Sequence, residues 1–117
     1  MELKRLDFIG PSLDDLREFP VEVKQEIGHA LHKVQMGIKP IEAKPLKGFG
    51  GAGVLEIIEN FFGDTYRAVY TVKFTEVIYV LHCFQKKSKS GIKTPRHEIE
   101  LIKRRLKLAE ELYKLDQ

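Results

Sequence analysis

The sequence predicts an α+β domain in which a small antiparallel β-sheet packs against two N-terminal helices and one C-terminal helix. Three consecutive runs rich in Val, Ile, Tyr and Phe, joined by short connections, predict the sheet. Apolar residues at helical spacing precede these runs in two segments and follow them in one. A chain of 117 residues can bury one core but rarely two, so we expect a single domain, 1–117, with the order β-α-α-β-β-β-α.

The N-terminal segment predicts a strand followed by a short helix. Residues 3–9 have the composition of a strand, which Gly10 ends. Ser12 is expected to cap the next helix, with Asp15 as an acid at its third position, because both would complement unpaired N–H groups. We expect this helix to end near Glu18.

A second, longer helix is predicted from Pro20 onward. Proline suits the first turn of a helix because its missing N–H would have no partner there, and Gly37 is expected to end the helix. The apolar residues at helical spacing, which we expect to cover the sheet, are Val23, Ile27, Ala30, Leu31 and Val34.

A long loop and three strands are predicted next. Residues 38–53 contain two Pro, four Gly and three Lys without any period, which is typical of a loop. The strands are predicted at 54–61, 66–74 and 77–84. The connections Gly63-Asp64 and Thr75-Glu76 are short, so these strands should pair in antiparallel fashion.

The last segment predicts a helix with Thr94 as its cap and Pro95 as its first residue, continuing to about Leu115. We expect all the helices to lie over one face of the sheet. One apolar stripe consists of Ile99, Ile102, Leu106, Ala109 and Tyr113, and a second of Leu101, Leu108, Leu112 and Leu115. The second stripe is compatible with burial in the core, with a dimer seam or with a groove for another protein.

Positive charge is concentrated near the C-terminal helix. Residues 1–84 carry ten basic and twelve acidic groups, residues 85–107 carry nine and two, and residues 108–117 carry one and three. Such a basic zone suits a polyanion such as RNA, because phosphate contacts release counterions. A basic segment can also be a solvated surface, and charge alone leaves both interpretations open.

Strand alternation sorts the residues that could perform chemistry. One side of the second strand should carry Tyr66, Ala68, Tyr70 and Val72, and the other Arg67, Val69, Thr71 and Lys73. In the third strand, His82, Phe84 and Lys86 should share one face, and Leu81, Cys83 and Gln85 the other. A cationic sheet surface is therefore expected around Arg67, with Glu56 and either His82 and Lys86 or their strand neighbours beside it. Its rim is expected to carry Lys44, Lys47, Lys87 and Lys89.

Each of these residues also has a purely structural interpretation. Glu56 could simply pair with Arg67 across the sheet, and His82 could be a packed core residue. Cys83 is the only cysteine and more readily a buried apolar residue than a nucleophile. The stacking of bases on strand aromatics competes with their burial in the core.

The sequence lacks the motifs that are typical of several classes of enzyme. No zinc-ligand spacing, nucleophile motif or carboxylate cluster for magnesium is visible, so we expect an enzyme, if this is one, to need no cofactor and no metal. A single cysteine permits no internal disulfide, and no apolar run approaches the length of about 18 to 20 residues that a membrane span requires. We therefore expect a soluble, cytoplasmic protein.

Three consecutive stretches, LKGFGGAGVLEI, DTYRAVYTVKF and VIYVLHCFQKKSKSGIKTPRHEIELIKRR, resemble the RelE/ParE toxin superfamily, and within it the HigB-like, phage-derived branch. The resemblance covers residues 44–105. It implies a RelE-like fold and the toxin of a type II toxin–antitoxin system, an endoribonuclease (mRNA interferase) that cleaves mRNA on the ribosome and so inhibits translation. It also implies a cognate helix-turn-helix antitoxin of the HigA type.

The resemblance implies an active surface made of Arg67, Lys86, Lys87, Glu56 and His82. Arg67 would contact the phosphate, Lys86 or Lys87 would stabilise it or protonate the leaving oxygen, and Glu56 or His82 would act as base. The residues expected to bind RNA are Lys44, Lys47, Lys89, Lys93, Arg96, His97, Lys103 and Arg104, with Arg105 and Lys107 beside them on the helix.

Two other functions remain open at this stage. A ParE-like toxin would poison DNA gyrase through protein contact without any RNA chemistry. A non-catalytic relic of the family would bind RNA or act as a regulator.

Overall fold

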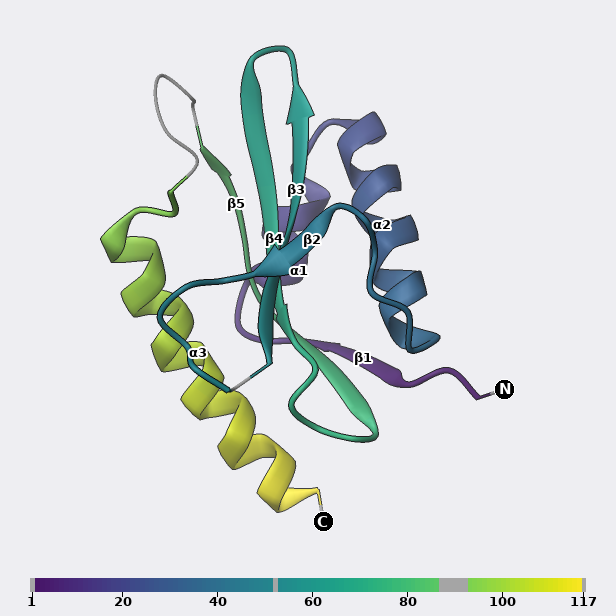
Figure 1. Ribbon diagram of the computed structural model, residues 1–117, viewed down its shortest axis with the longest axis vertical. Helices are drawn as coiled ribbons and strands as arrows, with labels where there is room; N and C mark the ends of the chain where they lie inside the picture. Colours follow the sequence, from purple (N-terminus) through teal and green to yellow (C-terminus); the bar gives the residue numbers. More distant parts are fainter. Residues whose placement is uncertain (1, 52, 87–92, 117) are drawn as a thin grey trace.

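The computed structural model describes residues 2–51, 53–86 and 93–116 (Figure 1). The elements in chain order are β1 (Arg5–Phe8), α1 (Ser12–Arg17), α2 (Val21–Gln35), β2 (Ala43–Pro45), β3 (Val54–Phe61), β4 (Asp64–Thr71), β5 (Val77–Lys86) and α3 (Arg96–Leu115). The predicted α+β class and the predicted order of elements are confirmed, with one additional strand. That strand, β2, lies in the segment predicted as a loop, because three residues are too few to show a period.

The strands form a single five-stranded sheet in the order β1-β5-β4-β3-β2. Neighbours from β2 to β5 are antiparallel, but β1 runs parallel to β5, with Arg5 opposite Val77 and Phe8 opposite Val80. The sheet is therefore mixed rather than wholly antiparallel as predicted. Strand β2 is an edge strand, which is where Pro45 can lie without removing a hydrogen bond that the sheet needs.

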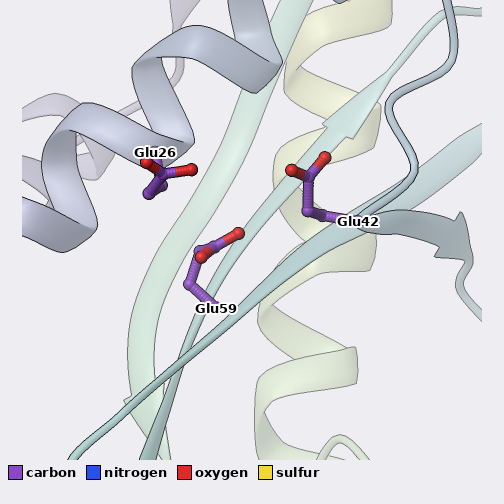
Figure 2. Close-up of side chains that lie close together, drawn as sticks. All are labelled: Glu26, Glu42 and Glu59. Carbon is purple, nitrogen blue, oxygen red and sulfur yellow. The ribbon is translucent and has the colours of Figure 1, made fainter.

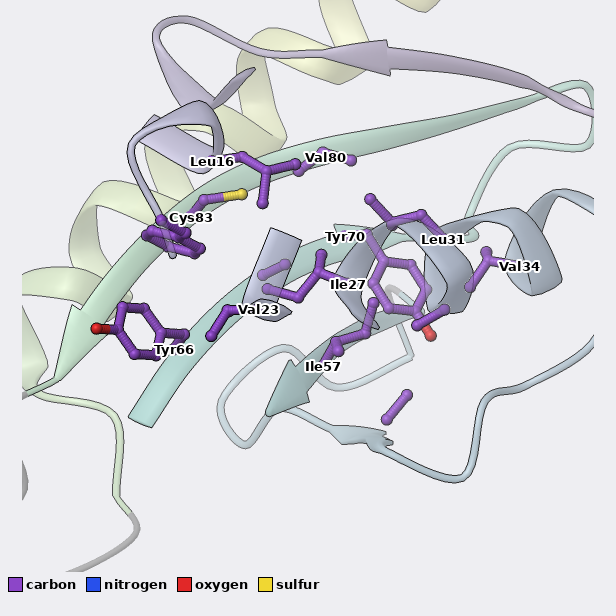
Figure 3. Close-up of a cluster of buried hydrophobic side chains, with 14 of the residues drawn as sticks. Leu16, Val23, Ile27, Leu31, Val34, Ile57, Tyr66, Tyr70, Val80 and Cys83 are labelled. Atoms are coloured by element: carbon purple, nitrogen blue, oxygen red, sulfur yellow. The ribbon is translucent and has the colours of Figure 1, made fainter. Parts of the chain in front are cut away.

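Helices cover both faces of the sheet, and the prediction that all of them lie over one face is wrong. On one face, α1 and α2 enclose a cluster that includes Ile27, Ile57 and Tyr70 (Figure 3). On the other face, α3 contributes Ile102 and Ala109 to a second cluster. Strand β5 is buried along most of its length, as a strand with two covered faces must be. Its sequence VIYVL is almost continuously apolar, which is typical of a strand that is covered on both faces.

A β-bulge in β5 changes the predicted alternation. Val69 pairs with His82, whereas Tyr70 pairs with Val80, so Leu81 is the additional residue. Leu81 therefore lies in the α3-side cluster, and Cys83 lies in the α2-side cluster. The prediction that these two residues share a face is wrong because one extra residue reverses the alternation.

Helix ends are formed mainly by backbone geometry. The carbonyls of Lys33 and Val34 accept from Ile38 and Gly37, and Gly37 has a φ of 85°, so α2 ends where predicted. The predicted side-chain caps are wrong: the hydroxyl of Ser12 donates to the carbonyl of Val80 over 3.2 Å, and Thr94 is engaged elsewhere. Pro11, Pro20 and Pro95 hold the N-cap positions instead.

None of the helices within the described residues has the length and apolar character needed to cross a lipid bilayer.

The second layer can be tested by removing one of its anchors. Ile102 is completely buried beneath α3, and we expect Ile102→Ala to lower the free energy of unfolding by about 2–5 kcal/mol. Ile41 is 95% exposed, so Ile41→Ala should change the stability by less than about 0.5 kcal/mol. Urea unfolding of both variants measures the difference. Equal, small losses would contradict the packing of α3 on the sheet.

Candidate functional site

A cationic pocket of about 450 Å³ lies on the α3 side of the sheet. It is lined by Lys44, Pro45, Leu46, Lys47, Glu56, Lys93, Thr94 and Ile99. The pairing of β2 with β3 places Lys44 opposite Glu56, and the approach to α3 brings Lys93 to the same opening. Three of the predicted RNA-binding lysines, Lys44 and Lys47 from one segment and Lys93 from a distant one, thus surround one pocket together with the predicted catalytic Glu56.

Beneath this pocket, Arg67 and Glu56 form a buried ion pair. Nη1 of Arg67 donates to the two carboxylate oxygens of Glu56 over 3.3 and 3.4 Å, and the side chains are only 1% and 3% exposed. Thr94 completes the network: its hydroxyl accepts from Arg67 over 3.0 Å and donates to Glu56 over 3.0 Å. The Nε of Arg67 is buried and has no hydrogen-bond partner among the residues that the structure describes. Arg67 therefore lies below the surface rather than on an open cationic sheet as expected.

Lys86 lies next to this pocket at the end of β5. Its Nζ donates to the carbonyl of Lys93, so the end of β5 and the segment that leads into α3 are held together. Lys87 and Lys89, which were also predicted to contribute, lie outside the described residues. The structure thus brings Lys86 beside the pocket lysine Lys93.

His82 is not among the residues that line the pocket, and both of its ring nitrogens are engaged. Arg105 can only donate, so Nδ1 of His82 accepts from it over 3.0 Å, and Nε2 donates to Glu98 over 2.8 Å. Burial lowers the pKa of His82, and Arg105 adds to this effect, while Glu98 opposes it. A neutral imidazole with both nitrogens occupied fits a positioning role better than that of a base.

The outer side of α3 carries exposed cations. The predicted RNA-binding residues on it are Arg96, His97, Lys103 and Arg104, and all four are exposed. Arg105 was expected among them, but it turns inward and donates to the carbonyl of Leu81 over 3.0 Å. Arg104 and Arg105 are adjacent in the sequence, but Arg104 faces solvent whereas Arg105 holds α3 against the sheet.

Three carboxylates from separate parts of the sequence converge on the other side of the sheet. Glu26 of α2, Glu42 before β2 and Glu59 of β3 have oxygen atoms within 4.8 Å of one another (Figure 2). Burial raises the pKa of Glu59, and the charges of Glu42 and Glu26 raise it further. The sequence showed no carboxylate cluster because each residue comes from a different element.

Comparisons with known proteins agree with this architecture. A family model described as "Phage derived protein Gp49-like (DUF891)" matches residues 14–107. A mutant of the E. coli toxin RelE in the free state is 22% identical, with a TM-score of 0.53 over 74% of this chain and 85% of that one. The Mycobacterium tuberculosis RelBE2 toxin–antitoxin complex contains a chain that is 18% identical, with a TM-score of 0.50 over 75% of this chain and 97% of that one. The chain therefore has a RelE-like fold. No curated protein matches it.

The buried ion pair predicts a large effect on stability. Arg67→Ala leaves the carboxylate of Glu56 buried without its counter-charge, and we expect the free energy of unfolding to fall by about 3–5 kcal/mol. Arg96→Ala removes the same charge from an exposed position and should change it by less than about 0.5 kcal/mol. Chemical denaturation checks this. A mild effect of Arg67→Ala would mean that the pair is solvated.

The carboxylate cluster predicts a pH-dependent gain in stability. Because the folded state raises the pKa of Glu59, the ionised side chain destabilises the fold as pH rises from the unfolded pKa of about 4.3 through the folded pKa. Glu59→Gln should therefore stabilise the protein at pH 7, by less than about 1 kcal/mol, and have no such effect at pH 3. Thermal unfolding at the two pH values tests this, and a loss of stability at pH 7 would contradict it.

Proposed function

The chain belongs to the family of phage-derived Gp49-like proteins, and on this basis we propose that it is the toxin of a type II toxin–antitoxin system. The family match spans most of the chain, and the fold is that of RelE. The RelE structure is described as a toxin, and the RelBE2 structure as a toxin–antitoxin complex. The partner proposed for this chain is a helix-turn-helix antitoxin of the HigA type.

The proposed activity is cleavage of mRNA on the ribosome. The observation that carries it is the convergence of Lys44, Lys47 and Lys93 around one pocket, since three cations in one cavity suit a phosphate chain. The exposed cations of α3 would contact ribosomal RNA. Ribosomes and messages are found in the cytoplasm, which is the compartment we propose for the protein.

The proposed reaction uses the nucleophile of the substrate itself. The 2′-oxygen of the RNA attacks the neighbouring phosphorus, the bond between phosphorus and the 5′-oxygen breaks, and a cyclic phosphate and a 5′-hydroxyl result. One group must accept the proton of the 2′-OH and another must protonate the leaving oxygen. Because the RNA provides the nucleophile, the reaction as proposed requires no metal and no organic cofactor.

The pocket offers groups for these steps. Glu56 is the carboxylate in its lining, and the donors Arg67 and Thr94 hold it in one orientation, so we assign the base role to Glu56. Lys44, Lys47 and Lys93 would stabilise charge on the phosphate as it develops. Lys86, or Lys87, would protonate the leaving oxygen. Arg67 would not contact the substrate but would orient Glu56 from beneath the pocket. His82 would hold α3 in place through its hydrogen bond to Glu98.

The proposal predicts that the pocket lysines are required for cleavage. We expect the double variant Lys44→Ala and Lys47→Ala to cleave messages at least about 100-fold more slowly, the loss typical of a removed charge-stabilising donor. The matched control, Lys24→Ala with Lys33→Ala, removes the same charge from α2 and should cleave like the parent. Induced expression with and without the antitoxin gene, followed by mapping of message ends, measures both.

Other outcomes would identify another function. Intact messages together with damaged DNA would indicate a ParE-like toxin that acts on gyrase. Normal growth with RNA binding that weakens as salt rises would indicate a non-catalytic binder. If the two double variants cleave messages equally fast, the pocket lysines are not required for cleavage and the proposed site is wrong.

A further inference from the structure

The turn between β3 and β4 holds a bulky residue in a left-handed backbone conformation. Phe61 and Asp64 form the last pair of the hairpin, so its two loop residues are Phe62 and Gly63. Their φ values are 49° and 85°. A turn of this kind favours Asn-Gly, and a side chain such as that of Phe is unfavourable by about 1–2 kcal/mol in this region. The turn lies one residue earlier than the predicted Gly63-Asp64.

The side chain of Phe62 provides no compensating burial. It is 92% exposed, and its ring makes an edge contact with Phe61, with centroids 4.6 Å apart. The left-handed backbone conformation therefore destabilises the folded chain, and the exposed ring gains no burial that would offset this cost. A strained residue without such compensation points to an interaction outside the folded chain.

The surroundings of the hairpin tip indicate the kind of partner. The hairpin projects well beyond the end of α2 (Figure 1). On the α3 side of the sheet, Thr65 near the tip pairs with Lys86, which contacts the pocket residue Lys93. The nearby acids lie on the other side, where Glu59 pairs with Tyr66 of the α2-side cluster and Asp64 accepts from Gln85 over 2.8 Å. Among the described residues, Lys86 thus places positive charge near the tip on the side of the pocket, and the nearby acids lie on the other side.

We infer that Phe62 is a stacking platform for an unpaired base of the RNA whose phosphates lie on the pocket lysines, an inference that rests on the proposed function. Along β3 the tip is about 20 Å from Glu56, a span that a single strand of a few nucleotides covers. Exposed aromatic rings beside a cationic track bind single-stranded RNA by stacking, which depends little on sequence.

The chain contains no tryptophan, so Phe62→Trp introduces a unique fluorescent reporter at the tip. We expect its emission to be quenched when a short 2′-O-methylated oligoribonucleotide, which cannot be cleaved, is added. Val21→Trp places the same reporter on α2, at a position that is 60% exposed, and should not be quenched. An oligonucleotide without a base at the stacked position should bind Phe62→Trp without quenching it.

Phe62→Asn separates stacking from folding because the two effects have opposite signs. Asparagine tolerates the left-handed conformation better than phenylalanine, so the thermal unfolding midpoint should rise. Affinity for the same oligonucleotide should fall about ten-fold, as for the loss of one stacked base, while the salt dependence stays that of the parent.

An unchanged affinity of Phe62→Asn, or quenching of the Val21 control equal to that at the tip, would overturn the inference. So would a loss of antitoxin binding by Phe62→Asn with RNA binding intact, because Phe62 would then contact a protein. If the parent chain cleaves messages and Phe62→Asn binds RNA equally well, only this inference fails. If the parent cleaves nothing but Phe62→Trp is quenched, the proposed nuclease fails and the stacking site stands.

Discussion

The buried pair of Arg67 and Glu56 is the constraint on which the rest of the site depends. A guanidinium that is only 1% exposed requires a counter-charge, so Glu56 is held on the neighbouring strand facing it. Thr94 bonds to both, and this places the segment before α3 above the sheet. The lysines of the pocket then surround a carboxylate whose orientation is already determined. One interaction therefore connects the packing of the second layer with the geometry of the candidate site.

The sheet also separates charges of opposite sign. On the side of α3 lie the pocket lysines and Lys86, whereas Glu26, Glu42 and Glu59 crowd together on the side of α2. A polyanion would be attracted to one side and repelled by the other. This polarity is hidden in the net charge of +3, because the two groups nearly cancel in the total.

Much of the fold was predictable because local patterns were strong. The strand predicted at 54–61 agrees with β3, and Gly37 ends α2 as expected, since both follow from residue types in one short window. The α3 layer, the bulge at Leu81 and the depth of Arg67 were not predicted. These features depend on which helices cover each face of the sheet. Strand alternation assigns residues to two faces, but it does not tell which face is open to solvent. The pocket lysines were named from the resemblance, but their convergence on one pocket is seen only in the three-dimensional structure.

The parallel pairing of β1 with β5 joins two segments that are far apart in the sequence, with Arg5 opposite Val77 and Phe8 opposite Val80. The hairpins of β3, β4 and β5 pair segments that are close in sequence and can form early. Strand β1 cannot pair until Val77 to Val80 have been synthesised. During synthesis the first strand therefore leaves the ribosome long before its partner does. A nascent chain has no complete sheet, and hence no complete α3-side pocket, until almost all of the protein has been translated.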